Sequence, residues 1–146
     1  YGGDWCHLVA GGQQGRLAVT VPCELLFVYG SLLSSSSHPM ARQLADAATL
    51  VGTARFHGRK YRVDWYSGVV PSETVKDVVT GEVYRLHDAA TLLPLLDVYE
   101  EAEPAWPAPA EYRRELRQVR MARGGSRVTC WIYLYNRPVA PLERLQ

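Results

Sequence analysis

Residues 25–32 read LLFVYGSL, and the rest of the chain is best understood from this stretch. Its first four residues are apolar without alternation, which predicts a strand that is covered on both faces. Gly30 then allows a turn where a Cβ would clash, and it leaves backbone N–H groups open to a ligand. Because successive free N–H groups form an anion-binding concavity, we expect a ligand to contact Tyr29, Gly30, Ser31 and Leu32. A core strand that ends in an ordinary turn would have the same sequence.

Length and composition indicate a single folded domain. The chain has 146 residues, of which 47% are hydrophobic, enough for a core and too many for disorder. The net charge is +1 and like charges do not cluster, unlike in nucleic-acid binders or polybasic membrane binders. No apolar run approaches the ~20 residues of a membrane span. We therefore expect neither nucleic acid nor membrane as a partner.

The cysteines and histidines do not form a recognisable metal site. Cys6, Cys23 and Cys130 are odd in number and include no C-x-x-C pair, so neither a disulfide framework nor a zinc site is expected. None of the four histidines lies three or four residues from another histidine or a cysteine, so we infer no metal. A reducing cytoplasm fits this pattern best, and Cys130, in an apolar strand, is most simply a core residue.

The chain divides into residues 1–24, an extension to which we assign no role, and a single domain over residues 25–146. Glycines interrupt any regular period in the extension. At the start of the domain, Ser37 is expected to cap a helix whose first turn contains Pro39 and which runs to about Ala48.

Three strands are expected after this helix. Residues 50–56 form the first, and its internal glycine marks a bend or bulge of the kind that small barrels need. Residues 60–66 form the second, which the Ser-Gly pair at residues 67–68 should end. Residues 81–86 form the third, with mixed polar and apolar faces.

The main helix is expected between residues 88 and 101. With Thr91 as its N-cap, Pro94 falls in the first turn, where a missing N–H is harmless. The proline-rich stretch that follows should stop the helix near Ala102. Its core face then consists of residues spaced i, i+3, i+4 and i+7, namely Leu92, Leu95, Leu96 and Tyr99.

Residues 111–121 and 127–135 are expected to be two strands of a hairpin that turns at the glycines 124–125. The second strand alternates between an aliphatic and an aromatic face, which predicts a core on one side and a pocket wall on the other. Its aromatic face carries Tyr133 and Tyr135. A strand that is simply buried on both sides would give the same pattern.

The order of elements is strand, helix, several strands, helix and hairpin, which indicates an α+β fold. The bends suggest a sheet that curls into a small mixed β-barrel of about five to seven strands with flanking helices. Because the first and last strands both have a buried character, we expect Tyr29, at the end of the first, to lie near Tyr135, at the end of the last.

Several motifs resemble those of the gamma-glutamylcyclotransferase-like family. One is FVYGSL at residues 27–32, and its companion is a Leu-Asp-x-x-Glu at a helix end, which residues 96–100 supply. Residues 79–84 look like the family's G-E-V-Y strand, residues 111–114 are similar to its Y-x-R strand start, and residues 131–135 look like its aromatic last strand. The resemblance covers most of the chain and implies a mixed barrel with helices packed outside.

The resemblance also implies a reaction, the cleavage of a γ-glutamyl amide. The α-amine of the glutamyl group attacks its own γ-carbonyl, which yields 5-oxoproline and a free amine and requires no cofactor or metal. Such a site must hold the substrate in a curled geometry, transfer protons and stabilise an oxyanion. Tyr112, Tyr133 and Tyr135 are further candidates for contacts with the substrate, although each is also compatible with a purely structural role.

Several acidic residues lie at the end of the expected helix, and helical geometry places them on different faces. The expected apolar face puts Asp97 and Glu101 on the solvent side of the helix. Glu100 lies at the edge of the buried face. Glu103 would lie at the centre of the buried face, but the proline after it should end the helix before this residue. Glu100 is therefore our candidate for the general acid and base, and the family motif points to the same residue.

Three hypotheses follow for the function. The first is a cyclotransferase that acts on a small γ-glutamyl amine or peptide, the second a binding module of the same shape, and the third a barrel used for protein contacts. The intact Glu100 favours the first over the second, and the turn at residues 29–31 favours either over the third. Glu101 stands where many family members have glycine, which leaves the leaving amine open. A monomer and a homodimer are both compatible with the sequence.

Overall fold

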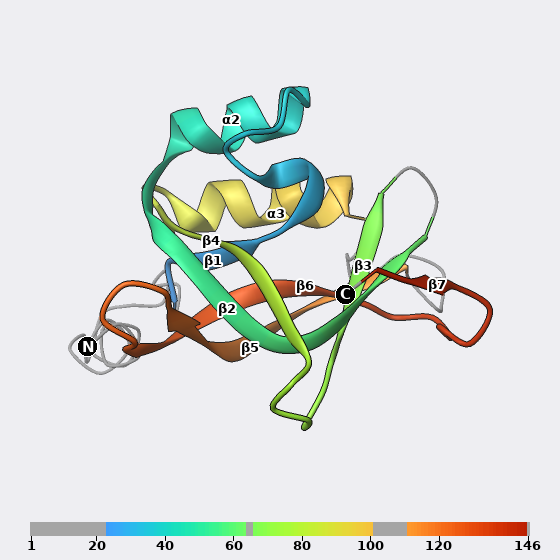
Figure 1. Cartoon of the computed structure of the whole chain (residues 1–146). Coiled ribbons are helices and arrows are strands. Elements are labelled where there is room, and N and C mark those ends of the chain that lie inside the picture. The colour runs from blue at the N-terminus through green and yellow to red at the C-terminus, as the bar shows by residue number, and fades with distance from the viewer. Residues whose placement is uncertain (1–22, 64–65, 101–110, 146) are drawn as a thin grey trace, which may run out of the picture.

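The computed structural model describes residues 23–63, 66–100 and 111–145 (Figure 1). Almost all of the extension at residues 1–24 lies outside this described part. The elements are, in chain order, β1 (Leu25–Val28), the 3-10 helix η1 (Gly30–Leu32), α2 (Pro39–Ala47), β2 (Ala48–Arg62), β3 (Ser67–Pro71), β4 (Val78–Leu86), α3 (Ala89–Tyr99), β5 (Tyr112–Met121), β6 (Arg127–Tyr135) and β7 (Glu143–Arg144).

The strands form a closed barrel. Their hydrogen-bonded order is β3-β2-β4-β1-β6-β5, and a further pairing of β2 with β5 closes the sheet. The barrel therefore consists of β2, β4, β1, β6 and β5, while β3 and β7 pair with the far end of β2. It is mixed because β1 and β6 run parallel, with Phe27 opposite Ile132, whereas its other pairs are antiparallel. This confirms the predicted α+β fold, a small mixed barrel with flanking helices.

The ends of β1 and β6 lie side by side, as the sequence predicted. Tyr29, directly after β1, donates a hydrogen bond from its hydroxyl to the carbonyl of Tyr133 near the end of β6, at 2.5 Å. On its other side β1 lies very close to β4 at Gly81, where a Cβ would come within 2.3 Å of the carbonyl oxygen of Val28. The turn that follows β1 is therefore anchored from both sides.

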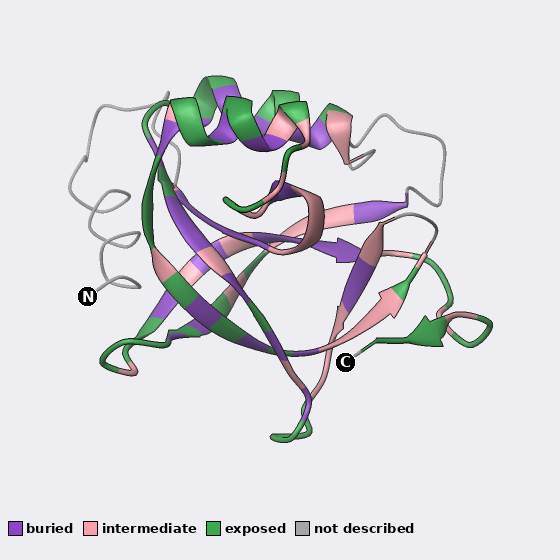
Figure 2. Ribbon diagram, turned by 45° about the horizontal axis from the view of Figure 1, so that its top comes forward, coloured by how far each residue is buried: buried purple, intermediate pink, exposed green. Residues whose placement is uncertain are grey.

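Two hydrophobic clusters lie on the two faces of the barrel wall. The cluster inside the barrel takes the aliphatic face of β6, which consists of Val128, Cys130, Ile132 and Leu134. The cluster between the barrel and the helices takes the aromatic face, with Tyr133 and Tyr135. Figure 2 shows the helices buried on the side that faces the barrel and exposed on the other. The predicted division of this strand into an aliphatic and an aromatic face is confirmed.

The long strand β2 replaces two expected strands. Its 15 residues include a register shift against β4 between Leu50 and Gly52, where the sequence predicted a bend. The Ser-Gly pair at residues 67–68 does not end a strand; it begins β3, which pairs with the end of β2. Glycine suits this place because a Cβ at Gly68 would come within 2.8 Å of the side chain of Tyr135.

Both long helices begin differently from the expectation. His38, not Ser37, caps α2, because its Nδ1 accepts a backbone N–H of the first turn at 3.0 Å. Asp88, not Thr91, caps α3, and its carboxylate accepts the Thr91 N–H at 3.3 Å. The helix therefore starts earlier and contains Pro94 in its interior, on the exposed side, where water can satisfy the carbonyl that the proline leaves unpaired.

The buried face of α3 is also rotated relative to the expected one. Leu95, expected in the core, is 54% exposed. The helix begins at Ala89, and both Ala89 and Leu93 are buried. The centre of the buried face therefore lies further from Leu95 than expected. The expected placement of Asp97 on the solvent side is therefore wrong. The buried residues of the helix are Ala89, Leu92, Leu93, Leu96 and Asp97.

Two further expectations concern the membrane and the cysteines. No helix in the described part of the chain is long and apolar enough to cross a membrane. Cys130 is a buried free thiol in the cluster inside the barrel, as predicted. Cys23, in contrast, is disulfide-bonded, which the sequence did not predict. The cytoplasmic location stays a prediction.

Candidate active site

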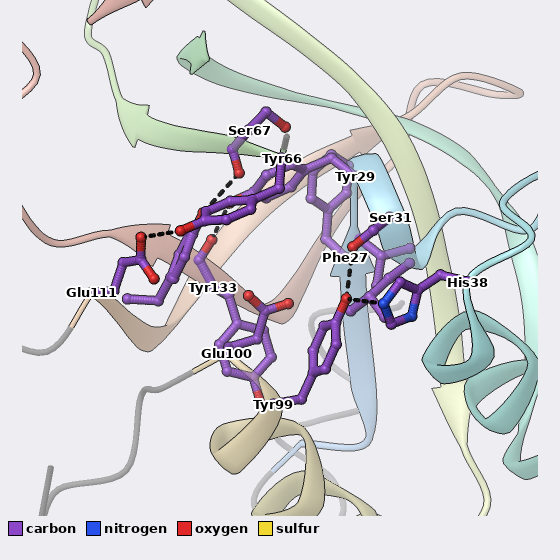
Figure 3. Close-up of a pocket in the computed structure, with 13 residues that line it drawn as sticks. Phe27, Tyr29, Ser31, His38, Tyr66, Ser67, Tyr99, Glu100, Glu111 and Tyr133 are labelled. Atoms are coloured by element: carbon purple, nitrogen blue, oxygen red, sulfur yellow. Dashed lines mark hydrogen bonds between the residues drawn. The ribbon is translucent and has the colours of Figure 1, made fainter. Parts of the chain in front are cut away.

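A pocket of about 180 Å³ lies where the end of β1, η1, the start of β3, the end of α3 and the starts or ends of β5 and β6 meet (Figure 3). Its described lining contains two carboxylic acids, Glu100 and Glu111, and no lysine or arginine. Neutral donors, mainly tyrosine and serine hydroxyls, make up most of its remaining polar groups. Among the described lining residues, only uncharged groups are therefore available to hold an anionic group that enters this pocket.

The turn after β1 brings such donors to the pocket. Gly30 has a φ of +68°, a conformation that favours glycine, and it begins η1. The N–H groups at the start of such a helix have no partner within it. Tyr29, Ser31 and Leu32 line the pocket, whereas Gly30 shapes the turn behind them and is not among the described lining residues.

Glu100 is the C-cap of α3, and its side chain points into the pocket (Figure 3). Its backbone N–H donates to the carbonyl of Leu96 at 2.8 Å, so the helix fixes its Cα. It lies four residues after Leu96 and seven after Leu93, and therefore continues the buried face of α3. The sequence placed Glu100 only at the edge of that face because it centred the face wrongly.

The Glu100 carboxylate is largely removed from water, and no side chain or backbone group among the described residues is its partner. Within the described residues, the structure gives no hydrogen bond or ion pair to either of its oxygens, and Figure 3 accordingly shows no dashed line there. The pKa of Glu100 is raised from 4.5 to about 8, mainly because burial disfavours the charged form and also because of the negative charge of Glu111. A carboxyl group with this pKa both accepts and releases a proton near neutral pH.

Glu111 is the second carboxylic acid of the pocket, and it does have partners. It is 9% exposed, and its Oε2 accepts a short hydrogen bond from the hydroxyl of Tyr66. The Nη1 of Arg137 lies 4.0 Å from the same oxygen. Sequence analysis treated Glu111 only as the start of a strand, so its place in the pocket was missed.

Three tyrosines close the pocket and keep their protons, namely the buried Tyr112 and Tyr133 and the half-buried Tyr29. The hydroxyl of Tyr112 donates to a backbone carbonyl of β3 at 2.8 Å, much as Tyr29 donates to β6. Burial raises the pKa of Tyr29, Tyr112 and Tyr133, and the nearby Glu100 adds to each shift. Tyr135, also proposed from the sequence, does not line the pocket. It packs edge-on against Tyr112, with ring centroids 5.6 Å apart.

Asp97 fixes α3 to the barrel one turn before Glu100. Its two carboxylate oxygens accept hydrogen bonds from Nε and Nη2 of Arg114 at 2.7 and 3.0 Å, and Oδ1 also accepts from the Tyr133 hydroxyl at 2.7 Å. The Arg114 guanidinium lies 4.3 Å from the ring centroid of Trp131. A bidentate, charge-assisted pair of this kind is geometrically specific. It therefore sets the rotation of α3 and with it the direction of the Glu100 side chain.

A second group of hydrogen bonds connects α3 to the turn after β1. The hydroxyl of Tyr99 lies 2.9 Å from Oγ of Ser31 and 3.4 Å from Nε2 of His38 (Figure 3). Tyr99 and His38 both line the pocket. The first residues of α2, the turn and the last turn of α3 thus meet at one point of the wall.

The structure brings most of the predicted site residues into one pocket. It adds residues that the sequence analysis missed, namely His38, Tyr66, Ser67, Tyr99 and Glu111. Two of these had a local signal, because Tyr99 and Glu111 directly precede the candidates Glu100 and Tyr112 in the chain. The others reach the pocket through β3 and the cap of α2, which the sequence analysis placed incorrectly. The roles of all these residues in binding and catalysis stay predictions.

A family model described as "Gamma-glutamyl cyclotransferase, AIG2-like" matches residues 26–146. The chain therefore belongs to the gamma-glutamyl cyclotransferase, AIG2-like family. The resemblance drawn from the short motifs is confirmed, and at the level of the family the protein is of the cyclotransferase type.

Individual proteins are also similar to this chain. Troponin C-akin-1 protein of Drosophila melanogaster is 28% identical over 121 residues, which cover 77% of this chain and 66% of the relative, just under two thirds of its length. An AIG2-like protein from Mus musculus superposes with a TM-score of 0.59 at 23% identity, covering 76% of both chains. YkqA from Bacillus subtilis superposes with a TM-score of 0.61 at 21% identity, covering 84% of this chain and 37% of YkqA. The two structures support the fold.

Proposed function

We propose that the protein is a gamma-glutamylcyclotransferase, which converts a small γ-glutamyl amine or peptide to 5-oxoproline and a free amine. The observation that carries this proposal is the Glu100 carboxyl group, which is desolvated, has no partner among the described residues and has a pKa raised to about 8. Family membership supports the class of reaction. The charges in the pocket also suit a γ-glutamyl group, because two carboxylic acids attract its ammonium while the turn at Gly30 supplies donors for its carboxylate.

In the proposed mechanism the γ-glutamyl group curls so that its α-amine faces its own γ-carbonyl. Backbone N–H groups at the start of η1 hold the α-carboxylate, which fixes one end of the chain. Intramolecular attack from a fixed geometry can remove ~7–11 kcal/mol from the barrier. The neutral hydroxyls of the pocket tyrosines are available to stabilise the oxyanion that forms on the γ-carbonyl carbon.

Two protons must leave the α-nitrogen in each turnover, and Glu100 is proposed to transfer them in succession. As a carboxylate it takes the first from the α-ammonium, and the freed amine then forms a bond to the γ-carbonyl carbon. The protonated Glu100 gives this proton to the leaving nitrogen, whose bond to the carbon breaks. Glu100 then takes the second proton from the ring nitrogen and passes it to the departing amine. The products are the lactam 5-oxoproline and an ammonium, so atoms and charges balance.

Three further proposals concern the substrate class, the location and the oligomeric state. We propose a small-molecule substrate, a cytoplasmic location and a monomeric or homodimeric protein, and analytical ultracentrifugation of the full chain distinguishes the two oligomeric states. A panel of γ-glutamyl amines and peptides identifies the leaving amine.

The test is the release of 5-oxoproline from a panel of γ-glutamyl amines and peptides, measured by mass spectrometry with the full chain. We expect release from at least one member and loss of that release in Glu100→Gln. The matched control is Glu73→Gln, at an exposed loop position, which should behave as wild type. Binding of panel members without release would instead indicate a non-catalytic binding module. Neither binding nor release would leave a barrel used for protein contacts.

A further inference from the structure

We propose that His38 and Tyr99 form a hydrogen-bond relay that fixes the Ser31 hydroxyl as a donor into the pocket, where it binds the ligand's carboxylate. In this relay His38 and Tyr99 are positioning residues, and Ser31 is the group that contacts the ligand. The inference deepens the proposed function, on which it rests, because it concerns the same pocket. The sequence favoured backbone donors at this turn, and the relay adds a side-chain donor to them.

The first step is the tautomer of His38. The backbone N–H of Met40 donates to Nδ1 of this imidazole at 3.0 Å. A backbone N–H can only donate, so Nδ1 carries no proton, and the neutral ring must carry its proton on Nε2. The same contact caps α2. The tautomer is therefore set by the start of the helix and does not depend on a ligand.

The second step is the direction of the Tyr99 hydroxyl. Its oxygen lies 3.4 Å from Nε2 of His38, and the two rings meet edge to face with centroids 5.2 Å apart. Because Nε2 carries a proton, the Tyr99 oxygen accepts at this contact. Burial raises the pKa of Tyr99, so its hydroxyl is protonated at neutral pH and has one proton to donate. The remaining contact of this hydroxyl is Oγ of Ser31, at 2.9 Å, and it receives that proton.

The third step is the Ser31 hydroxyl. A serine hydroxyl has one proton and two acceptor positions, and the contact with Tyr99 occupies an acceptor position. Its own proton is thereby left for another partner, and Ser31 lines the pocket. Chains of this kind polarise each member, so the last donor is stronger than an isolated hydroxyl.

The fourth step is the group that this donor fits. The described lining has no lysine or arginine, so an anionic group depends on neutral donors. Ser31 belongs to the same turn as the N–H groups at the start of η1, and its hydroxyl adds a side-chain donor to them. The carboxyl groups of Glu100 and Glu111 instead suit the ammonium. We therefore assign the Ser31 hydroxyl to the ligand's carboxylate.

A double-mutant cycle on the full chain tests the relay, with 5-oxoproline as the probe and calorimetry as the measurement. Ser31→Ala should weaken binding about tenfold, as expected for a hydrogen bond to a charged group. Tyr99→Phe should weaken it about threefold, because Ser31 remains but is no longer directed. The double variant should bind like Ser31→Ala alone, since Tyr99 acts through Ser31.

Two sets of variants control for structural damage. Ser35→Ala, exposed in the same loop, and Tyr84→Phe, buried away from the pocket, should bind as wild type. His38→Asn keeps a residue that caps helices well but cannot reach Tyr99, so it should match Tyr99→Phe with an unchanged melting temperature. Multiplying effects in the double variant, or normal binding in a folded Tyr99→Phe, would overturn the relay.

Two further readouts separate the possible failures. In turnover, Ser31→Ala should raise KM and leave kcat nearly unchanged; a fall in kcat alone would assign the hydroxyl to the oxyanion and overturn the carboxylate assignment. Nitrogen NMR should show the Nε2–H tautomer of His38, and the Nδ1–H tautomer would contradict the relay.

If the cycle behaves as expected but no γ-glutamyl amine is turned over, the proposed function fails alone. If turnover is normal but 5-oxoproline does not bind, the relay's carboxylate assignment fails alone.

Discussion

The Asp77 cluster (Arg59, Ser72, Asp77 and Arg144) and the pocket around Glu100 both remove a carboxylate from water, and they do so in opposite ways. Asp77 is 7% exposed and accepts hydrogen bonds at 2.6–2.7 Å from its three partners in the cluster. These donors hold the pKa of Asp77 well below its ordinary value. Glu100 has no such donor in the described chain, and its pKa is raised to about 8.

This difference separates a structural carboxylate from one that is suited to chemistry. The Asp77 cluster ties the loop between β3 and β4 to β2 and β7, and its charge is fully compensated. Asp97 is a structural carboxylate like Asp77, although it lies one turn from Glu100, because Arg114 and Tyr133 donate hydrogen bonds that compensate its charge. On one face of α3, one carboxylate therefore anchors the helix and the next is left for proton transfer.

Removal of the unpaired carboxylate should have the largest effect on turnover. Glu100→Gln keeps the size of the side chain but cannot take a proton. Turnover is expected to fall by ~10²–10⁴-fold in steady-state assays, while binding of 5-oxoproline largely survives. Near-normal turnover in this variant, with a collapse in Glu103→Gln, would move the role to Glu103, which lies outside the described residues.

The same Glu100→Gln variant should be more stable than wild type at neutral pH. The folded pKa, about 8, lies above the ordinary value of 4.5, so the folded state binds this proton more tightly than the unfolded state. The stability that the wild type gains from binding this proton is fully present below about pH 4.5 and is lost as the pH rises through 8. The variant has no such group to titrate, so it does not lose this stability. Each pKa unit corresponds to about 1.4 kcal/mol, so the gain is on the order of a few kcal/mol. Thermal unfolding from acid to alkaline pH measures it, and an unchanged pH dependence in the variant would contradict it.

Breaking a compensated carboxylate next to the pocket should affect stability first and turnover second. Asp97→Asn removes the charge that Arg114 pairs with and should cost about 1.5–3 kcal/mol in denaturant unfolding. Turnover should also fall, by roughly tenfold, because Glu100 is then less well oriented. Asp46→Asn, exposed on α2, is the matched control and should change neither quantity. Normal turnover in a destabilised Asp97→Asn would show that the anchor does not orient Glu100.

Breaking the Asp77 cluster should change stability but not turnover. The folded pKa of Asp77 is depressed, so its stabilising effect is present above the unfolded pKa of ~3.9 and is lost as the pH falls toward the folded value. Asp77→Asn should therefore melt at a lower temperature at neutral pH and depend less on pH in the acid range. Calorimetric scans check this, and a marked loss of turnover would contradict the division between the two regions.

The smallest expected effect is a shift in a pH profile. If Glu100 must be ionised to act as the base, kcat/KM should rise with pH around a midpoint near 8. The charge of Glu111 contributes to that midpoint, so Glu111→Gln should move it to lower pH, while Glu73→Gln should leave it in place. An unmoved midpoint in Glu111→Gln would mean that the two carboxyl groups do not interact.

The sequence predicted the parts of the fold and the site that depend on neighbouring residues. The alternation along β6 and the turn at Gly30 are local patterns, and both are found in the structure. The choice of Glu100 was also local, although its argument used a wrongly centred helix face. An N-cap at Thr91 would keep Pro94 out of the helix interior, but it also turns the expected buried face away from Leu93, which the structure buries.

The parts that the sequence did not predict depend on pairing between distant segments. Asp97 was expected in water because its partner Arg114 lies 17 residues away on β5, and an apolar-face argument alone puts a lone carboxylate outside. Glu111 could not be assigned to the pocket without the position of Tyr66, which lies 45 residues away before β3. The contrast between compensated and uncompensated carboxylates therefore became visible only in three dimensions.

The central claim is that the fold leaves Glu100 uncompensated so that it titrates near neutral pH. Carbon NMR of the side-chain carboxyl groups across a pH titration tests it directly, with Glu100→Gln used to assign the signal. The account predicts a midpoint near 8 for Glu100, well separated from the other carboxyl groups of the chain. A midpoint near the ordinary value of 4.5 would contradict the claim and with it the assignment of Glu100 as the proton-transferring group.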